Sequence, residues 1–61
     1  MPIVQIEFKE GRTVDQKRKL VEKVTQAVVD SISVPPENVT IILREMNKEN
    51  HAKGGKLDYD R

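Results

Sequence analysis

Three periodic segments occupy most of this short chain and restrict the folds open to it. Residues Ile3–Lys9 alternate apolar and polar side chains, which is typical of a half-buried strand. Residues Val14–Ile32 repeat apolar side chains at the spacing of an amphipathic helix. Residues Val39–Met46 are β-branched with a continuous apolar centre, which predicts a second strand buried on both faces. A helix between two strands favours a parallel pair with a right-handed crossover.

Short local signals mark where these segments begin and end. Thr13 and Gln16 have the spacing of a capping box, which predicts the start of the helix. The Pro35-Pro36 pair is predicted to end the helix, because the residue before a proline is pushed toward extended backbone. Near the carboxyl end, Gly54-Gly55 allows two interpretations, a tight hairpin turn or a flexible loop.

The chain is too short to stabilise such a fold easily by itself. Its 61 residues make one domain, 1–61, and a chain of this size buries only about 60 % of its unfolded surface. It has no cysteine for disulfides, and only 3% of its residues are aromatic. Two strands and one helix also leave one sheet face and the outer strand edges uncovered, which invites further copies of the chain. We therefore expect a homo-oligomer whose functional sites could lie between subunits.

Charge and hydropathy argue against several classes of function. The 11 basic and 10 acidic side chains give a formal net charge of +1, which is too balanced for a nucleic-acid partner. The helix lysines and arginine are interspersed with acidic residues and indicate a solvated face. We expect no membrane partner and a cytoplasmic location, because no apolar run is long enough to span a bilayer and no signal peptide is evident. No motif has the spacing of metal ligands.

Pro2 follows the initiator Met1, and this position can create a base that no side chain supplies. A small residue after the initiator normally lets Met1 be removed, and Pro2 would then carry a free secondary amine instead of an amide nitrogen. An α-amino group titrates near pKa ~7.7–8.0, close to the range in which a general base works best. Pro2 also has the parity of Val4, Ile6 and Phe8, so its ring should start the apolar strand face. The alternative is an ordinary first residue of a strand.

These features together resemble the short-chain 4-oxalocrotonate tautomerase family. The match runs from Pro2 to Gly55, nearly the whole chain. Each motif is weak alone, but their order and spacing are specific in so short a chain. The segments that carry the resemblance after Pro2 and the first strand are Glu10-Gly11-Arg12-Thr13, Asp15-Gln16-Lys17, Leu20-Val21-Glu22-Lys23-Val24-Thr25, Glu45-Met46 and Gly54-Gly55.

The resemblance implies an α/β (α+β) fold: a β-α-β subunit with parallel strands, one crossover helix and a short C-terminal hairpin or loop, assembled as a hexamer or a related oligomer. It also implies an isomerase that interconverts enol and keto forms, or unconjugated and conjugated forms, of small 2-oxo acids without cofactor or metal. Pro2 would be its general base. Arg12 matches the family arginine that holds a substrate carboxylate, which a guanidinium grips with two parallel hydrogen bonds.

Two positions depart from the family pattern. Thr40 stands where well-known members carry a second arginine, which polarises the substrate carbonyl, and His51 stands where they carry an aromatic residue of the pocket wall. Arg44 should share a strand face with Thr40 and is a candidate to replace the missing charge; the alternative is an ion pair with Glu45 or Glu49. His51 either lines the pocket, where a neutral imidazole could polarise an enol oxygen, or is an exposed turn residue.

The sequence leaves two other functions open. A subunit with the same fold could serve in assembly alone, which would suit both departures from the family pattern and a retained Met1. A hydrolytic relative that adds water to an unsaturated or halogenated acid would need a carboxylate to orient the water. Residues 50–53 contain none, although Glu49 and Asp58 are near in sequence.

Overall fold

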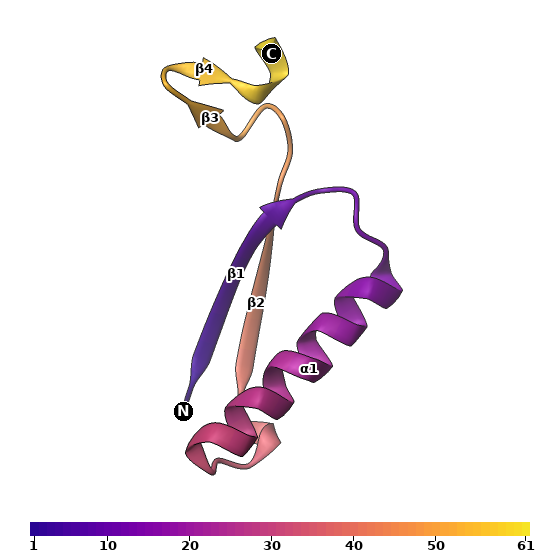
Figure 1. The fold of residues 1–61 in the computed structure, drawn as a ribbon, viewed down its shortest axis with the longest axis vertical. Coiled ribbons are helices and arrows are strands. Elements are labelled where there is room, and N and C mark those ends of the chain that lie inside the picture. Colours follow the sequence, from indigo (N-terminus) through magenta and orange to yellow (C-terminus); the bar gives the residue numbers. More distant parts are fainter.

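The computed structural model describes all 61 residues and shows a β-α-β body that continues into a small C-terminal hairpin (Figure 1). The hairpin lies beyond the carboxyl end of the second strand, which makes the molecule elongated, 44 × 24 × 14 Å. The elements, in chain order, are strand β1 (Ile3–Lys9), helix α1 (Val14–Ile32), the 3-10 turn η1 (Pro36–Asn38), strands β2 (Thr40–Met46), β3 (Ala52–Lys53) and β4 (Lys56–Leu57), and the 3-10 turn η2 (Asp58–Asp60).

Strands β1 and β2 form a parallel pair, which confirms the prediction. The register pairs every residue of β1 with one of β2. Backbone hydrogen bonds continue the pairing at both ends, because the Thr40 N–H donates to the Pro2 carbonyl at 3.0 Å and the Glu10 N–H to the Met46 carbonyl at 3.0 Å. Pro2 is therefore held against the start of β2.

The capping box predicted at the start of α1 is present. The Thr13 N–H donates to Gln16 Oε1 at 3.0 Å, and the Gln16 N–H donates to Thr13 Oγ1 at 3.1 Å. The helix ends before the Pro35-Pro36 pair, at Ser33, which has a left-handed φ of 57° and donates its N–H to the Val29 carbonyl at 3.0 Å. The last helical residue is therefore Ile32, as predicted, and the left-handed Ser33 caps the helix two residues before the prolines. No helix of the chain is both long and apolar enough to cross a membrane.

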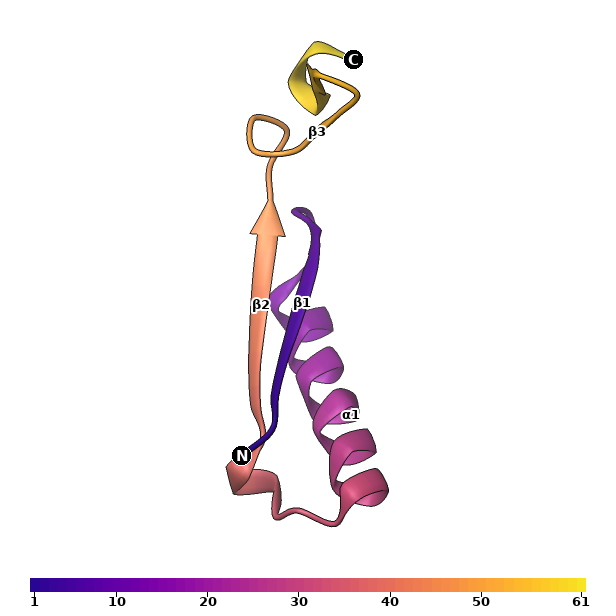
Figure 2. The ribbon, with the colours of Figure 1, turned by 90° about the vertical axis from the view of Figure 1, so that its left-hand side faces the viewer.

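Helix α1 covers one face of the two-stranded sheet and leaves the other face open (Figures 1 and 2). In β1 the side chains on the covered face are the half-buried Val4, Ile6 and Phe8, as the alternation predicts. The prediction that the second strand is buried on both faces is wrong for a single chain, because Ile42 on the open face is 40% exposed. The apolar run of β2 makes both of its faces suitable for burial, but a single subunit has only α1 to cover one of them.

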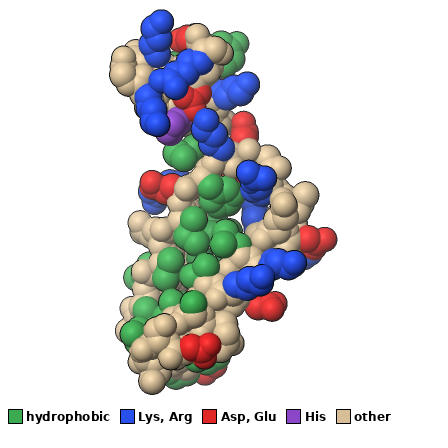
Figure 3. All heavy atoms as spheres, viewed as in Figure 1, with side chains coloured by type: hydrophobic (Ala, Val, Ile, Leu, Met, Phe, Trp, Pro, Cys, Tyr) green, Lys and Arg blue, Asp and Glu red, His purple; other side chains and the backbone are tan.

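A single chain has no fully buried side chain. Figure 3 shows hydrophobic side chains at the surface along the body of the molecule. Because burial of apolar surface is the main favourable contribution to folding, this shortage agrees with the expectation that the subunit is stabilised in an oligomer.

The Gly54-Gly55 pair forms the turn of a tight hairpin, which decides between the two interpretations of this dipeptide. Its φ angles are 57° and 82°, and a type I′ hairpin turn requires positive φ at both central residues. Strands β3 and β4 pair antiparallel on either side of the turn. The base of the hairpin is closed by the Asp58 N–H, which donates to the His51 carbonyl at 2.8 Å.

Candidate active site

Pro2 lies half-buried at the start of β1, on the sheet face that α1 covers. With Val4 it lines a shallow hollow whose other wall includes Val24, Ala27 and Val28 of α1. The hollow has a volume of ≈ 410 Å³, and Ser31 is its only lining residue with a polar side chain. Such a surrounding disfavours a charged ammonium relative to a neutral amine.

Met1 is joined to the ring nitrogen of Pro2 by an amide bond and contributes little to the fold. It is 89% exposed and takes part in none of the backbone hydrogen bonds. The sheet holds Pro2 through its carbonyl oxygen, which accepts from the Thr40 N–H. Removal of Met1 would therefore free the ring nitrogen without breaking a hydrogen bond of the sheet.

Arg12 is the one arginine whose guanidinium has no partner. It is exposed in the loop between β1 and α1 and borders a hollow of ≈ 350 Å³ whose apolar side chains are Ile6, Phe8 and Leu20. A free guanidinium beside apolar surface suits a carboxylate with a hydrocarbon body. The other arginines are engaged as follows: Arg18 with Asp15 at 2.7 Å, Arg44 with Glu7 at 2.9 Å, and Arg61 with the Lys53 carbonyl at 3.1 Å.

Pro2 and Arg12 lie at opposite ends of β1 (Figure 1). The strand between them has 7 residues, which at ~3.3 Å per residue is about 23 Å. The two hollows share no lining residue. One chain therefore does not bring both groups to the same small molecule, and a site that uses both must take them from different subunits.

Arg44 lies on the open face of the sheet, opposite the helix. It stands across from Glu7 in the β1–β2 register, and Nη1 bonds Glu7 Oε2 at 2.9 Å. Arg44 thus forms an ion pair, but with neither of the predicted partners, Glu45 and Glu49. Glu45 pairs instead with Lys17 at 2.7 Å. Both side chains of the Arg44–Glu7 pair are more than half exposed, at 57% and 54%. Exposed pairs of this kind contribute only about 0–1 kcal/mol, so a carboxylate ligand could displace Glu7.

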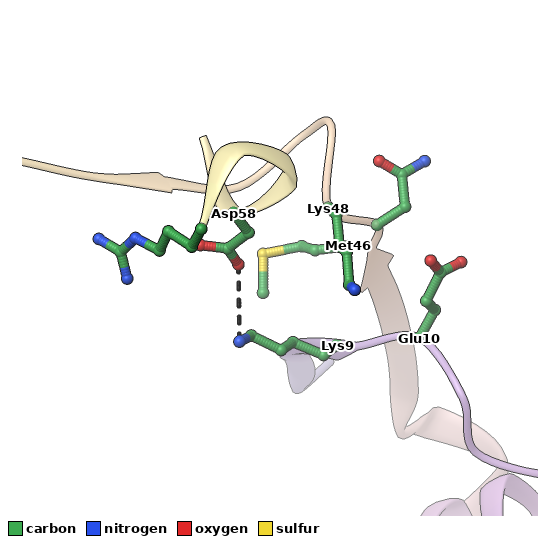
Figure 4. A pocket seen from close by; sticks show the side chains of 7 residues that line it. Lys9, Glu10, Met46, Lys48 and Asp58 are labelled. Atoms are coloured by element: carbon green, nitrogen blue, oxygen red, sulfur yellow. Dashed lines mark ion pairs between the residues drawn. The ribbon is translucent and has the colours of Figure 1, made fainter. Parts of the chain in front are cut away.

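His51 lies half-buried at the base of the hairpin, bonded to Asp58. Its Nδ1 is 2.7 Å from Asp58 Oδ2, and Lys9 at the end of β1 approaches the same oxygen at 3.5 Å, the dashed line in Figure 4. The Asp58 side chain is only 11% exposed. The hydrogen bond from His51 lowers the pKa of Asp58; desolvation opposes this shift, and the charge of Lys9 reinforces it. Asp58 is therefore an ionised carboxylate at neutral pH.

The sequence points to His51 but not to the partners of its ring. Asp58 follows His51 by seven residues, and Lys9 belongs to a distant strand. The sequence could have indicated Asp58. A hairpin that turns at Gly54-Gly55 pairs Ala52 with Leu57, and the residues that flank this pair, 51 and 58, then lie side by side. No three His, Asp or Glu side chains are grouped so that they could hold a metal ion.

The fold and these sites define a small β-α-β enzyme subunit, and comparison with known proteins identifies its family. A family profile described as tautomerase enzyme matches residues 2–60. The chain therefore belongs to the tautomerase family and is an isomerase. Members of the family act on small molecules and form oligomers.

Relatives of similar length support this assignment. A probable tautomerase of Halalkalibacterium halodurans is 48% identical over 60 residues, which cover 98% of each chain. The 2-hydroxymuconate tautomerase of Bacillus subtilis is 45% identical over 56 residues, which cover 92% of this chain and 90% of the relative.

Solved structures confirm the predicted fold. The crystal structure of a 4-oxalocrotonate tautomerase homologue superposes with a TM-score of 0.92 at 33% identity, covering 100% of this chain and 97% of the homologue. A second homologue of 4-oxalocrotonate tautomerase gives a TM-score of 0.88 at 42% identity, with 98% of each chain covered. The resemblance found in the sequence is thus correct for both family and architecture.

Proposed function

We propose that this tautomerase interconverts the enol and keto forms, or the unconjugated and conjugated forms, of a small 2-oxo acid, with the amine of Pro2 as its general base after Met1 is removed. The observation that carries the proposal is the position of Pro2, half-buried in an apolar hollow and held by its carbonyl alone. The family match beginning at residue 2 supports it. The name of the Bacillus subtilis relative supports an enol of a 2-oxo acid as the substrate class.

Pro2 would act by moving one proton. The neutral amine takes a proton from the enol and becomes an ammonium, and the ammonium returns a proton to carbon as the keto form appears. No other reactant is consumed, so the amine is restored after each turnover. An apolar wall helps because it disfavours the ammonium and keeps the resting amine neutral.

Arg12 would bind the substrate carboxylate. Its guanidinium is the only one in the chain without a protein partner, and it stands beside apolar side chains. Its charge would also draw electrons toward the 2-oxo end as negative charge develops there. Arg44 would add a second positive charge from the open sheet face once a ligand replaces Glu7.

The active site would form between subunits of a homo-oligomer, for which the family resemblance suggests a hexamer. Pro2 and Arg12 of one chain are separated by the length of β1, and the sheet face that bears Arg44 is uncovered in a single chain. Association would cover the open face and bring these groups together. The cytoplasmic location expected from the sequence belongs to the same proposal.

An ultraviolet assay tests the proposal. Met-free protein is added to a panel of enolised 2-oxo acids, and Pro2→Ala protein of the same oligomeric size serves as the control. We expect the wild type to accelerate decay of the enol and Pro2→Ala to lose about 10²-fold of that activity, because its amine is primary and lacks the ring that fixes the base in the hollow. Decay no faster than in buffer would contradict the proposal and favour a subunit that serves only in assembly.

A further inference from the structure

We propose that Asp58 holds the His51 ring so that its other nitrogen, Nε2, accepts a hydrogen bond from the hydroxyl group of an enol substrate. His51 would then select the enol, and Asp58 would be a positioning residue that acts through His51. This inference rests on the proposed function and adds His51 of one subunit to the tautomerase site.

The contact between the two side chains determines which nitrogen carries the proton. An ionised carboxylate can only accept hydrogen bonds. Asp58 is ionised at neutral pH, and its Oδ2 lies 2.7 Å from His51 Nδ1. The hydrogen must therefore be on Nδ1, which leaves a lone pair on Nε2 of the neutral ring.

This tautomer decides what the neutral ring can do. It cannot donate a hydrogen bond from Nε2 to an enol oxygen. It can accept from a hydroxyl group, which the enol form of a 2-oxo acid has and the keto form lacks. The His51 side chain is 28% exposed, so it is not sealed inside the subunit.

The surroundings of Asp58 keep this arrangement in place. Lys9 binds the same carboxylate oxygen from the end of β1, so the base of the hairpin is tied to the body of the subunit. Glu10, Lys48 and Arg61 are the other charged residues that line the hollow next to Asp58 (Figure 4). Asp60 lies two residues further on, is exposed and makes no side-chain hydrogen bond or ion pair, which makes it a matched control.

The kinetic test compares two substrates in the wild type, His51→Ala, Asp58→Ala, the double variant and Asp60→Ala. One substrate is a 2-hydroxy dienoic acid; the other is an unconjugated 2-oxo acid without a hydroxyl group. We expect each single variant at 51 or 58 to raise KM for the hydroxyl substrate by about three- to tenfold, the effect of one hydrogen bond. The double variant should cost no more than either single variant, because both changes remove one interaction. KM for the hydroxyl-free substrate, and both KM values of Asp60→Ala, should stay unchanged.

Several results would overturn the proposal. Equal losses with both substrates would mean that Asp58 merely supports the hairpin. Additive losses in the double variant would mean that Asp58 does not act through His51. No change in KM for the hydroxyl substrate would remove His51 from the site.

Nitrogen NMR tests the ring itself without any turnover. At a pH where the ring is neutral, His51 should carry its proton on Nδ1 in the wild type and in Asp60→Ala, and should lose this preference in Asp58→Ala. A proton on Nε2 in the wild type would refute the proposed role of Asp58. If the wild type converts neither substrate, the proposed function fails, and NMR alone decides whether Asp58 holds the ring.

Discussion

At the scale of single residues, the proposed role of Arg12 in binding substrate can be tested against Arg18, whose guanidinium already has a protein partner. Arg12→Ala should lower kcat/KM about ten- to hundredfold, because a hydrogen-bonded charge on the substrate loses its partner. Arg18→Ala removes a guanidinium that is also exposed but is bonded to Asp15, and it should leave kcat/KM unchanged. Steady-state kinetics on a 2-oxo acid carboxylate would show this difference, and equal effects of the two changes would remove Arg12 from the site.

Arg44 has a second informative partner, Glu7. If Arg44 binds substrate, Arg44→Ala should raise KM or lower kcat. Glu7→Gln should lower KM, because it releases the guanidinium from its ion pair. Neither change should alter the free energy of unfolding by more than about 1 kcal/mol, since the pair is exposed. Unchanged kinetics in both variants would leave Arg44 as a surface residue.

Contacts within a short stretch of chain could be predicted from the sequence, and contacts between strands could not. Pro2 was singled out by its place after Met1 and Arg12 by the resemblance to the family, and the roles of both stay predictions. The Arg44–Glu7 contact depends on the parallel register, which places these residues opposite each other. Glu45, adjacent in sequence, was the natural expectation, but neighbouring residues of a strand point to opposite faces.

At the scale of elements, the C-terminal hairpin should depend on the ionised form of Asp58. The pKa of Asp58 is lowered in the folded chain, so the folded state binds this proton less readily than the unfolded state. Its stabilising contribution is therefore complete above the ordinary aspartate value of 3.8 and is lost as the pH falls below it. Asp58→Asn should lack this contribution at neutral pH and show a flatter loss of stability in acid.

Thermal unfolding followed by circular dichroism at one protein concentration would measure this effect, because association also changes the midpoint. Asp60→Asn is the control and should behave as the wild type does. Identical acid profiles for Asp58→Asn and the wild type would show that the His51 contact does not stabilise the folded chain.

The periodicity of the sequence predicted the helix and the two long strands, but it did not predict what covers each face of the sheet. The alternation in β1 and the capping box of α1 are local patterns, and the structure has both where they were predicted. The apolar centre of β2 was read as burial on both faces, but one chain covers a single face. A run of side chains reports that a face is apolar and says nothing about which molecule covers it.

At the scale of the whole molecule, the separation of Pro2 and Arg12 predicts complementation between inactive variants. Pro2→Ala and Arg12→Ala chains should each be nearly inactive alone. Unfolded together and refolded, they should regain activity, because some sites then receive an intact Pro2 from one chain and an intact Arg12 from another. Random mixing in a symmetric oligomer restores about a quarter of the sites.

Size-exclusion chromatography with light scattering would accompany this experiment, to show that single and mixed samples have the same oligomeric size. Mixed samples no more active than the sum of the separate ones would place both groups in one chain, against the distance along β1.

The central claim concerns one nitrogen atom, and it can be tested by changing only that atom. The chain is short enough for chemical synthesis, so the protein can be made once beginning at Pro2 and once beginning at Met1, with all other residues identical. Both should fold and assemble to the same size, because Met1 is exposed and takes part in no backbone hydrogen bond. The chain that begins at Pro2 should catalyse enol decay, and the chain that begins at Met1 should match buffer. Equal activity of the two would contradict the account.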